Sequence, residues 1–363
     1  AGVVAAMEPW WRERCGNPSN RLHRPGLEAA AAVERARGQI AAALDTSPEA
    51  VILTSGATEA NNLALKGTVE AARTRDTRRR RVVTLTTEHR AVLDPLAWLE
   101  RQGVPGTVLP VGPDGLVDLE VLEAALGDDV LLLSVMAANN EIGVLRPLSA
   151  VAERCRRRGV LLHCDAAQAV GHVPLSLAEL PIDLLSLSGH KLYGPKGIGA
   201  LVRRPNVPLA AQQHGGGQEE GLRAGTLPVP LIVGLGEAVT IAMADRQARA
   251  RRLGEQRDRL WRELQALGDI TLNGNPRRRL PHNLNVTVGG VDGTRLHLAL
   301  RRRLAVSSGS ACSAGSPSHV LRALGRSRLE AAASIRFGLG RETSEAEIDA
   351  AIDAVREAVA QLR

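Results

Sequence analysis

Residues 160–168 read Val-Leu-Leu-His-Cys-Asp-Ala-Ala-Gln, a short apolar run that ends in polar and small side chains. Similar apolar runs occur at 51–53, 82–85, 130–135, 182–187 and 198–202. Segments with helical spacing, such as 60–72 and 148–158, separate most of these runs. Strands that alternate with helices predict an α/β fold, in which helices cover both faces of a mainly parallel sheet.

The character of the sequence changes after Ile241. A long, charged, helix-like stretch continues to Ala266, and a region rich in Pro and Asn follows it. Alternating segments then occur at 284–288 and 334–339, which predict a second, smaller α+β unit. We expect a large domain at 13–245 and a small domain made of 1–12 and 246–363.

The positive charge of the chain says little about its partners. The 363 residues include 46 Lys+Arg and 39 Asp+Glu, which gives a formal net charge of +7. Only Lys66, Lys191 and Lys196 are lysine, so the other 43 cations are arginine, as expected from coding bias toward GC-rich codons. One Tyr, one Phe and four Trp supply few stacking platforms for bases. We therefore expect no direct nucleic-acid binding.

The spacing of the cysteines and the lack of long apolar stretches indicate the cellular compartment of the protein. The four cysteines, Cys15, Cys155, Cys164 and Cys312, show neither C-x-x-C pairing nor metal-ligand spacing. This predicts a reducing cytoplasm and no metal site. No apolar stretch approaches the ~20 residues of a membrane span, and residues 1–11 lack the features of a signal peptide. We expect a cytoplasmic protein without membrane contact.

The apolar run at 51–53 leads into Thr-Ser-Gly-Ala-Thr-Glu at 54–59, where a helical pattern begins. Small residues and free backbone N–H groups at a helix N-terminus are suited to bind a phosphate. The motif is neither a Walker loop nor G-x-G-x-x-G. Taken alone, the motif favours an ordinary capped helix over a phosphate site.

Other apolar runs also end in residues that carry chemistry. These residues are His89, Asn140, Asp165, Gln168, Ser188, His190 and Lys191. In such a sheet the ligand binds beyond the carboxyl ends of the strands, so we expect these side chains at one edge. A lysine amine, a carboxylate and a phosphate site at a helix N-terminus are the groups that hold pyridoxal phosphate.

The scarcity of lysine narrows the choice of the amine. Where arginine has replaced lysine nearly everywhere, a retained lysine is predicted to need an amine that can lose its proton. Lys191, between His190 and a glycine-rich turn, is the best candidate for a Schiff base. Lys66 is predicted to be a solvated helix residue, and Lys196 is either a loop residue or a ligand of the phosphate.

The segments at 54–62, 139–144, 188–199, 214–226 and 307–312 resemble those of cysteine desulfurases of the iron–sulfur-assembly type, within the class V aminotransferase family. The resemblance extends from 15–19 to 335–341. It implies a type I pyridoxal phosphate transferase fold with a seven-stranded sheet, and a homodimer whose active sites are completed across the interface. It also implies conversion of L-cysteine to L-alanine, with sulfur passed to an acceptor such as an iron–sulfur scaffold or a thiocofactor or tRNA pathway.

The resemblance implies a role for each matched residue. Lys191 would bind pyridoxal 5'-phosphate covalently, Asp165 would pair with its ring nitrogen, and His89 would stack on the ring and transfer protons. The other cofactor-binding residues would be Gln168 and Asn140 at the ring hydroxyl, Ala57, Thr58, Ser188 and His190 at the phosphate, and Thr226 at the phosphate of the partner subunit.

The resemblance assigns the sulfur chemistry to Cys312, which lies in a small, polar stretch at 307–316. Its thiolate would take the sulfur of L-cysteine as a persulfide, while Arg336 and Asn140 would bind the substrate. The other cysteines are predicted to be structural. Cys164 in particular should face away from the cofactor, because it alternates with Asp165 along a strand.

Two departures from the family pattern keep other hypotheses open. The family has an N-terminal active-site segment, and we expect this chain to begin downstream of it. The stretch between Cys312 and Ser318 is also shorter than is usual. The alternatives are a selenocysteine lyase or another β-eliminating class V enzyme, and a noncatalytic sulfur-transfer partner.

Overall fold

The computed structural model describes residues 1–75, 78–307 and 318–363. The helices are α1 (Gly2–Arg12), α2 (Arg24–Ala43), α3 (Ala57–Arg73), α4 (Arg90–Arg101), α5 (Leu119–Ala125), α6 (Leu148–Arg158), α7 (Val229–Ala244), α8 (Arg246–Gln265), α9 (Gly293–Leu300), α10 (His319–Ala323), α11 (Arg328–Ala332) and α12 (Glu345–Leu362). The strands are β1 (Val51–Thr54), β2 (Arg81–Leu85), β3 (Gly106–Leu109), β4 (Val130–Met136), β5 (Leu161–Asp165), β6 (Leu184–Ser188), β7 (Gly199–Arg203), β8 (Ile270–Leu272), β9 (Asn283–Val288) and β10 (Ser334–Gly338). Short 3-10 turns lie at η1 (Pro48–Ala50), η2 (Gly189–Leu192) and η3 (Gln218–Gly221).

The larger sheet has seven strands in the order β1-β7-β6-β5-β4-β2-β3. The neighbours from β6 to β3 pair in parallel, whereas β7 is antiparallel to both β1 and β6. The α/β fold with a mainly parallel seven-stranded sheet is therefore confirmed.

Strand β3 is the member of this sheet that the apolar pattern did not predict. It has four residues, lies at the sheet edge beside β2, and leaves Val108 43% exposed. An edge strand is covered less than a central one, so it does not need a continuous apolar run.

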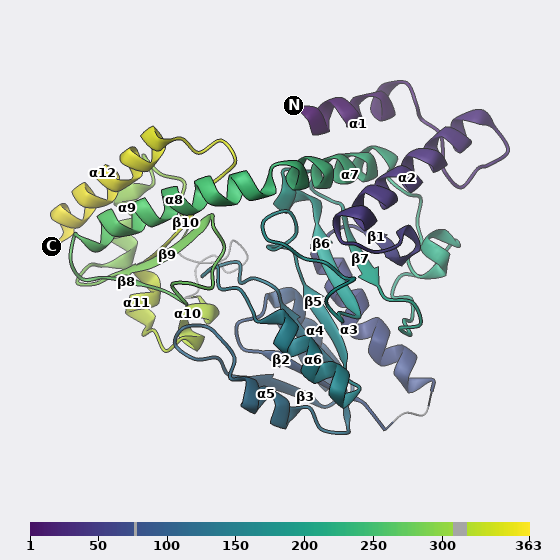
Figure 1. Ribbon diagram of the computed structural model, residues 1–363, viewed down its shortest axis with the longest axis horizontal. Coiled ribbons are helices and arrows are strands. Elements are labelled where there is room, and N and C mark those ends of the chain that lie inside the picture. The colour runs from purple at the N-terminus through teal and green to yellow at the C-terminus, as the bar shows by residue number, and fades with distance from the viewer. Residues whose placement is uncertain (76–77, 308–317) are drawn as a thin grey trace.

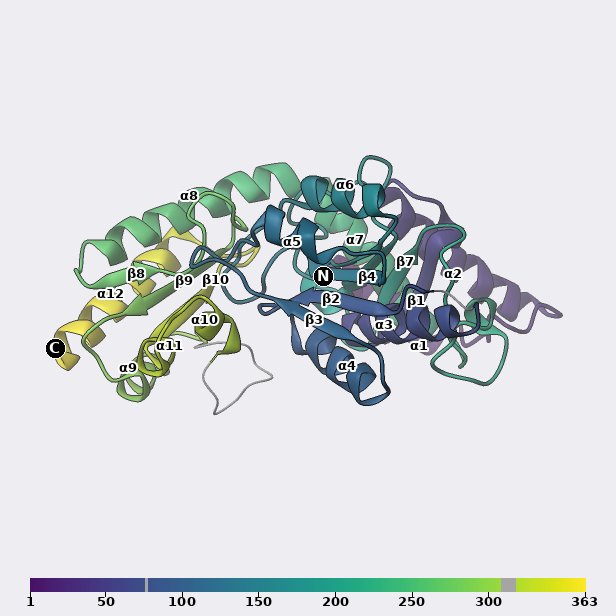
Figure 2. The ribbon, with the colours of Figure 1, turned by 90° about the horizontal axis from the view of Figure 1, so that it is seen from below.

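Helices cover both faces of the larger sheet, because neighbouring strand residues point to opposite sides. Val82 and Leu132 pack in one cluster with apolar residues of α3 and α4. Val83 and Leu133, the next residue of each strand, pack in the other cluster with residues of α2, α6 and α7. Figure 2 shows α4 on one side of the sheet and α6 on the other.

The smaller sheet is antiparallel, in the order β10-β9-β8. Its own core includes Leu260 of α8, Val286 of β9 and Val355 of α12. Helix α8 begins near the larger sheet, where α7 ends, and runs to the smaller one (Figure 1). The structure therefore contains the smaller α+β unit that the sequence predicted.

The limits of the two domains stay a prediction, and the structure adds one difference at the N-terminus. The predicted boundary near residue 245 falls between the end of α7 and the start of α8. Helix α1, however, packs against α7, and Val3 and Trp10 contact the core of the larger sheet. This placement differs from the prediction that 1–12 joins the small domain. The physical reason is that the apolar side chains of α1 find their apolar contacts on the larger unit.

Candidate active site

A cavity of about 490 Å³ opens at the carboxyl ends of the central strands. Met136, Asp165 and Ser188, the last residues of β4, β5 and β6, all line it. Arg336 reaches it from β10 of the smaller sheet, so the cavity lies between the two units. This is the position at which a doubly wound sheet binds its ligands.

The structure brings most of the predicted site residues to this cavity. The lining includes Ala57, Thr58, His89, Asn140, Asp165, Gln168, Ser188, His190, Lys191 and Arg336. Thr226 is exposed and is not among the lining residues of the described chain. Cys312 lies outside the described residues. The roles assigned to all these residues remain predictions.

Asp165 is held in a fixed orientation at the floor of the cavity. One carboxylate oxygen, Oδ2, accepts a hydrogen bond of 2.7 Å from Asn61 Nδ2, and Oδ1 accepts one of 3.0 Å from the Ala167 N–H. Sequence reasoning missed Asn61. The available signal was its position in α3, because Asn61 follows Ala57 and precedes Leu65 at helical spacing on the side that faces the sheet.

The N-terminus of α3 forms one end of the cavity. Its N-cap, Gly56, has φ +150°, a conformation that L side chains rarely adopt. The first N–H groups of a helix have no partner within the helix, so those of Ala57 and Thr58 can bind an anion. His190 Nδ1 lies 2.9 Å from Ser188 Oγ at this end. Burial, followed by the charges of Lys191 and Lys196, lowers the pKa of His190.

Glu59 is the negative charge at the same helix N-terminus, and it is neutralised locally. Its carboxylate accepts a 2.8 Å hydrogen bond from Arg223 Nε and another of 2.8 Å from the Ser55 N–H. Burial raises the pKa of Glu59, but these hydrogen bonds outweigh that effect and leave the pKa lowered. The paired carboxylate therefore does not cancel the attraction of this end for an anion.

His89 is both a cavity residue and the N-cap of α4. Its Nδ1 accepts a 3.1 Å hydrogen bond from the Ala91 N–H. A nitrogen that accepts carries no proton, so the neutral imidazole of His89 has its proton on Nε2. Nε2 is therefore the atom through which the neutral ring can donate a hydrogen bond.

The structure places two of the three lysines at the cavity and the third elsewhere. Lys191 and Lys196 both line the cavity, which supports the phosphate-facing alternative for Lys196. Lys66 was predicted to be solvated, but its Nζ lies 4.6 Å from the centroid of the Trp98 ring. This is a cation–π contact away from the cavity.

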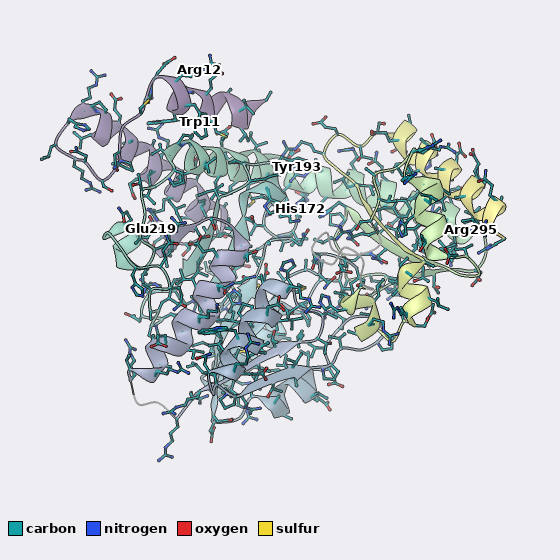
Figure 3. All side chains as sticks on the ribbon, turned by 180° about the vertical axis from the view of Figure 1, so that it is seen from behind. Trp11, Arg12, His172, Tyr193, Glu219 and Arg295 are labelled. Carbon is teal, nitrogen blue, oxygen red and sulfur yellow. The ribbon has the colours of Figure 1, made fainter. Side chains whose placement is uncertain are left out.

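The residues around Lys191 connect the two units. Tyr193, which has φ 59°, accepts a 2.7 Å hydrogen bond at its hydroxyl from the Arg341 N–H. His172 Nε2 lies 3.4 Å from the Lys191 carbonyl oxygen, and its ring contacts that of His282, with centroids 4.2 Å apart and planes tilted by 38°. Figure 3 labels His172 and Tyr193 on the side of the larger unit that faces the smaller one. The strand exit that carries Lys191 is thus braced by the smaller unit.

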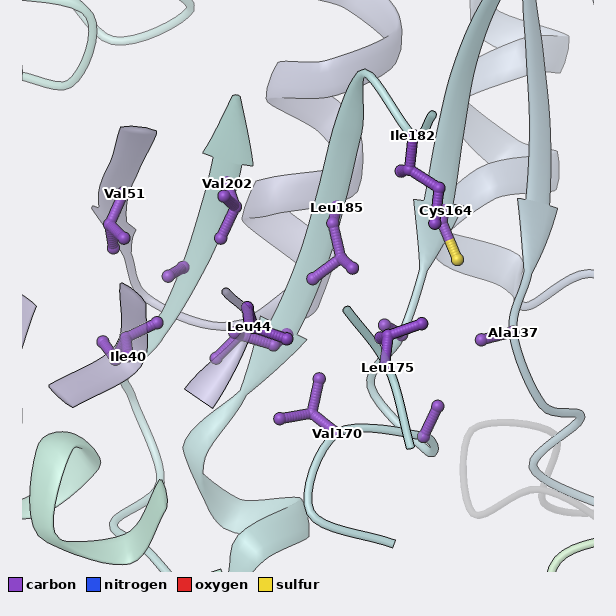
Figure 4. Packing of buried hydrophobic residues seen from close by; sticks show 14 of the residues in the cluster. Ile40, Leu44, Val51, Ala137, Cys164, Val170, Leu175, Ile182, Leu185 and Val202 are labelled. Atoms are coloured by element: carbon purple, nitrogen blue, oxygen red, sulfur yellow. The ribbon is translucent and has the colours of Figure 1, made fainter. Parts of the chain in front are cut away.

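The burial of Cys155 and Cys164 supports the prediction that both are structural. Burial raises the pKa of Cys155 to about 12 and that of Cys164 well above its ordinary value. The Cys164 sulfur packs among apolar side chains of the core, near Ile182 (Figure 4). Neither thiol forms the thiolate that sulfur chemistry needs. Cys15 is exposed.

His163 belongs to the core of the sheet and not to the cavity lining. It lies within β5, fully buried, with Nδ1 2.8 Å from Ser134 Oγ and Nε2 3.0 Å from Ser186 Oγ. Burial lowers its pKa to about 3, so the ring is neutral at physiological pH. His163 is therefore a core residue whose two ring nitrogens are both hydrogen-bonded.

Glu88 is a fully buried acid next to His89, for which the sequence suggested no role. Burial raises its pKa to about 8, with opposing effects from Arg146 and the Met136 backbone and a further rise from Asp165. A folded-state pKa above the unfolded value means that the folded chain retains a proton between about pH 5 and 8. Stability should therefore fall as pH rises through this window.

We expect Glu88→Gln to remove this pH dependence, because the amide is neutral at every pH. Between pH 5 and 8, the wild type should lose free energy of unfolding on the order of a few kcal/mol relative to the variant. Urea unfolding at several pH values measures the difference. Glu255→Gln, at an exposed site, is the control. Parallel pH curves for the wild type and Glu88→Gln would show that Glu88 is ionised throughout.

Comparisons with known proteins agree with the geometry. The sequence model for "Aminotransferase class-V" matches residues 1–351. Cysteine desulfurase IscS of Pectobacterium atrosepticum is 49% identical over 352 residues, which are 96% of this chain and 86% of that protein. A solved NifS-like protein has a TM-score of 0.92 at 36% identity, with 99% of this chain and 96% of that chain covered. The structure titled "SspA in complex with cysteine" has a TM-score of 0.82 at 35% identity, covering 93% and 94%.

These matches extend over nearly the whole chain and include both units. They confirm the resemblance to cysteine desulfurases that the motifs at 54–62, 139–144 and 188–199 indicated. On this evidence the chain belongs to the aminotransferase class-V family.

Proposed function

We propose that this chain is a pyridoxal phosphate-dependent cysteine desulfurase, which converts L-cysteine to L-alanine and transfers the sulfur to Cys312 as a persulfide. The observation that carries the proposal is the cavity that joins Lys191, Asp165, His89 and Arg336. The name of the IscS relative, and the cysteine bound to SspA, support the same activity.

The donor set of the cavity fits pyridoxal phosphate. The oriented carboxylate of Asp165 can pair with a protonated ring nitrogen, and Lys191 offers an amine for covalent attachment. The α3 N-terminus, with Ser188, His190 and Lys196, offers N–H donors and positive charge to a phosphate. Gln168 and Asn140, which also line the cavity, would contact the ring hydroxyl. When bound, the cofactor supplies an electron sink for bonds at the substrate α-carbon.

Arg336 is suited to bind the substrate carboxylate. Its Nη1 donates a 2.9 Å hydrogen bond to the Asn140 carbonyl oxygen, which fixes the guanidinium and leaves other N–H groups for a ligand. Burial lowers the pKa of Arg336 and the charge of Glu141 counteracts it, but arginine stays charged in either case. An amino acid bound here would place its amine and side chain toward the centre of the cavity.

The sulfur step would use Cys312. Its thiolate sulfur forms a bond to the substrate sulfur while the substrate C–S bond breaks. The electron pair of the broken bond stays with the carbon, which takes up a proton to give alanine. His89 lines the cavity and is the side chain that would relay this proton.

The direct test is alanine formation by purified protein supplied with pyridoxal phosphate and L-cysteine. A cysteine desulfurase releases alanine and accumulates persulfide. A selenocysteine lyase keeps releasing alanine from selenocysteine in the Cys312→Ala variant, and a noncatalytic partner forms no alanine from either substrate. The proposal is supported if alanine forms from L-cysteine and if Cys312→Ala abolishes this reaction.

Asn61 gives a test of the cofactor assignment that does not depend on turnover. Asn61→Ala removes the hydrogen bond to Asp165 Oδ2, so we expect pyridoxal phosphate to bind about tenfold more weakly. Asn62→Ala is the matched control, because Asn62 Nδ2 instead donates to the Thr58 carbonyl oxygen. Absorbance titration of cofactor into cofactor-free protein measures both. Equal affinities for the two variants would show that the Asn61 hydrogen bond to Asp165 does not support cofactor binding.

We further infer a homodimer that passes sulfur to an acceptor such as an iron–sulfur scaffold. The exposure of Thr226 outside the cavity of its own chain supports a role at the partner subunit's phosphate. Across the described part of the chain, no helix is both long and apolar enough to cross a bilayer. A cytoplasmic location is proposed from the four widely spaced cysteines, which show no C-x-x-C pattern.

A further inference from the structure

The residues on either side of the sequence segment that holds Cys312 are tied to Arg336, which lines the cavity, and to Glu141, which follows the lining residue Asn140. On the N-terminal side, the Arg336 N–H donates a 2.7 Å hydrogen bond to the Ser307 carbonyl oxygen, and the Ser307 N–H returns a longer one of 3.5 Å. On the C-terminal side, Ser318 Oγ donates to Glu141 Oε2. Arg336 and Glu141 thus contact the two positions at which this segment joins the described chain.

Glu141 is fully buried and rigidly held. Its N–H donates a 2.8 Å hydrogen bond to Asn139 Oδ1, and its carbonyl oxygen accepts from Asn283 and Asn285 of the smaller sheet, at 3.3 and 3.1 Å. Its Oε1 atom is buried and accepts no hydrogen bond within the described residues. Such a carboxylate is costly unless its charge is balanced, and Ser318 alone does not balance it.

Arg336 is a positive charge near Glu141. Glu141 follows Asn140, whose carbonyl oxygen accepts from Arg336 Nη1, and Glu141 is the charge that opposes the burial effect on the pKa of Arg336. A single carboxylate therefore acts on the guanidinium that lines the cavity and on the serine that follows the Cys312 segment.

We propose that Glu141 is a positioning residue with two effects. It holds Ser318, the residue that follows the Cys312 segment, and it partly offsets the positive charge of Arg336. The inference rests on the proposed function, and it adds that substrate-carboxylate binding and the rate of sulfur transfer depend on the same side chain. Removing the charge should tighten carboxylate binding while it slows sulfur transfer. Removing only the Ser318 contact should slow sulfur transfer without changing carboxylate binding.

A purely structural role for these groups gives a different expectation. Ser318 Oγ also accepts a 3.1 Å hydrogen bond from the Leu321 N–H and so caps α10. His319 Nε2 lies 2.9 Å from the Glu88 carbonyl oxygen, a second tie at the same place. If capping were the whole role, Ser318→Ala would lower stability but leave the reaction rate of the folded protein unchanged.

The experiment compares Glu141→Gln and Ser318→Ala with wild type, all loaded with pyridoxal phosphate. Glutamine keeps the size and an acceptor oxygen but removes the charge. Ser149→Ala, at an exposed position of α6, is the matched control for the serine variant. Binding of L-alanine, which has a carboxylate but no thiol, is followed by cofactor absorbance. The rate of persulfide formation is measured in a single turnover with L-cysteine.

We expect Ser318→Ala to bind L-alanine like wild type but to form persulfide about tenfold to a hundredfold more slowly, because a small misplacement of a reacting group has effects of this size. Glu141→Gln should show the same slowing together with L-alanine binding that is tighter by about threefold or more. Ser149→Ala should match wild type in both measurements.

The outcomes distinguish this inference from the proposed function. A wild type that binds cofactor but makes no alanine overturns the proposed function, and the inference falls with it. An active wild type, accompanied by folded variants whose persulfide rates stay within about twofold of it, overturns the positioning role alone. If Glu141→Gln does not fold, Ser318→Ala still decides, because slow transfer with unchanged L-alanine binding supports the role and an unchanged rate refutes it.

Discussion

Lys191→Ala should bind no cofactor covalently, and its turnover of L-cysteine should fall by at least about 10³-fold. Alanine has no amine to form the covalent bond, and the two other lysines do not replace it. Lys66 lies over Trp98, away from the cavity. Lys196 lines the cavity beyond the strand exit, where we expect it to meet the phosphate. Borohydride reduction followed by mass spectrometry measures the covalent adduct directly.

Two further variants make the lysine result specific. Lys191→Arg keeps a positive charge but not an amine that can lose its proton, so it should fail like Lys191→Ala. Lys66→Ala should keep the adduct and the activity. An adduct found on Lys196, or full activity in Lys191→Arg, would contradict the assignment.

Cys312→Ser should form no persulfide, and alanine production from L-cysteine should fall by at least about 10²-fold. A hydroxyl is a poor nucleophile toward sulfur at neutral pH. The buried cysteines cannot substitute, because burial raises the pKa of the Cys155 thiol to about 12 and that of Cys164 well above its ordinary value. Persulfide labelling and alanine analysis together measure this effect.

Cys15→Ser is the matched control for Cys312→Ser, since Cys15 is the exposed cysteine among the described residues. It should leave both alanine and persulfide at wild-type levels. Persulfide that survives in Cys312→Ser and disappears in Cys15→Ser would move the nucleophile to Cys15.

Much of the site could be predicted because the sheet determines it. A residue at the end of a buried strand, or just after it, is carried to the sheet edge whatever its neighbours are. The apolar runs therefore place Asp165, Ser188 and Lys191 there, and the scarcity of lysine singles out Lys191. Arg336 required the family resemblance. It lies on a strand of the other sheet, and no local pattern indicates which sheet edge that strand will face.

The parts that sequence reasoning missed depend on contacts between distant residues. Asn61 looks like any helix residue until α3 lies beside β5 and its amide meets Asp165. Glu141 reads as one more polar residue in a turn until Ser318, far along the chain, donates to it. Helix α1 joins the larger unit because of its packing against α7, which periodicity does not encode.

Mass spectrometry of the cofactor-loaded protein after addition of one equivalent of L-cysteine tests the central claim most directly. The expected result is one additional sulfur atom on the peptide that contains Cys312, with an equal amount of alanine in solution. A protein that holds pyridoxal phosphate on Lys191 but shows no added sulfur at Cys312 and no alanine would contradict the claim that this chain is a cysteine desulfurase.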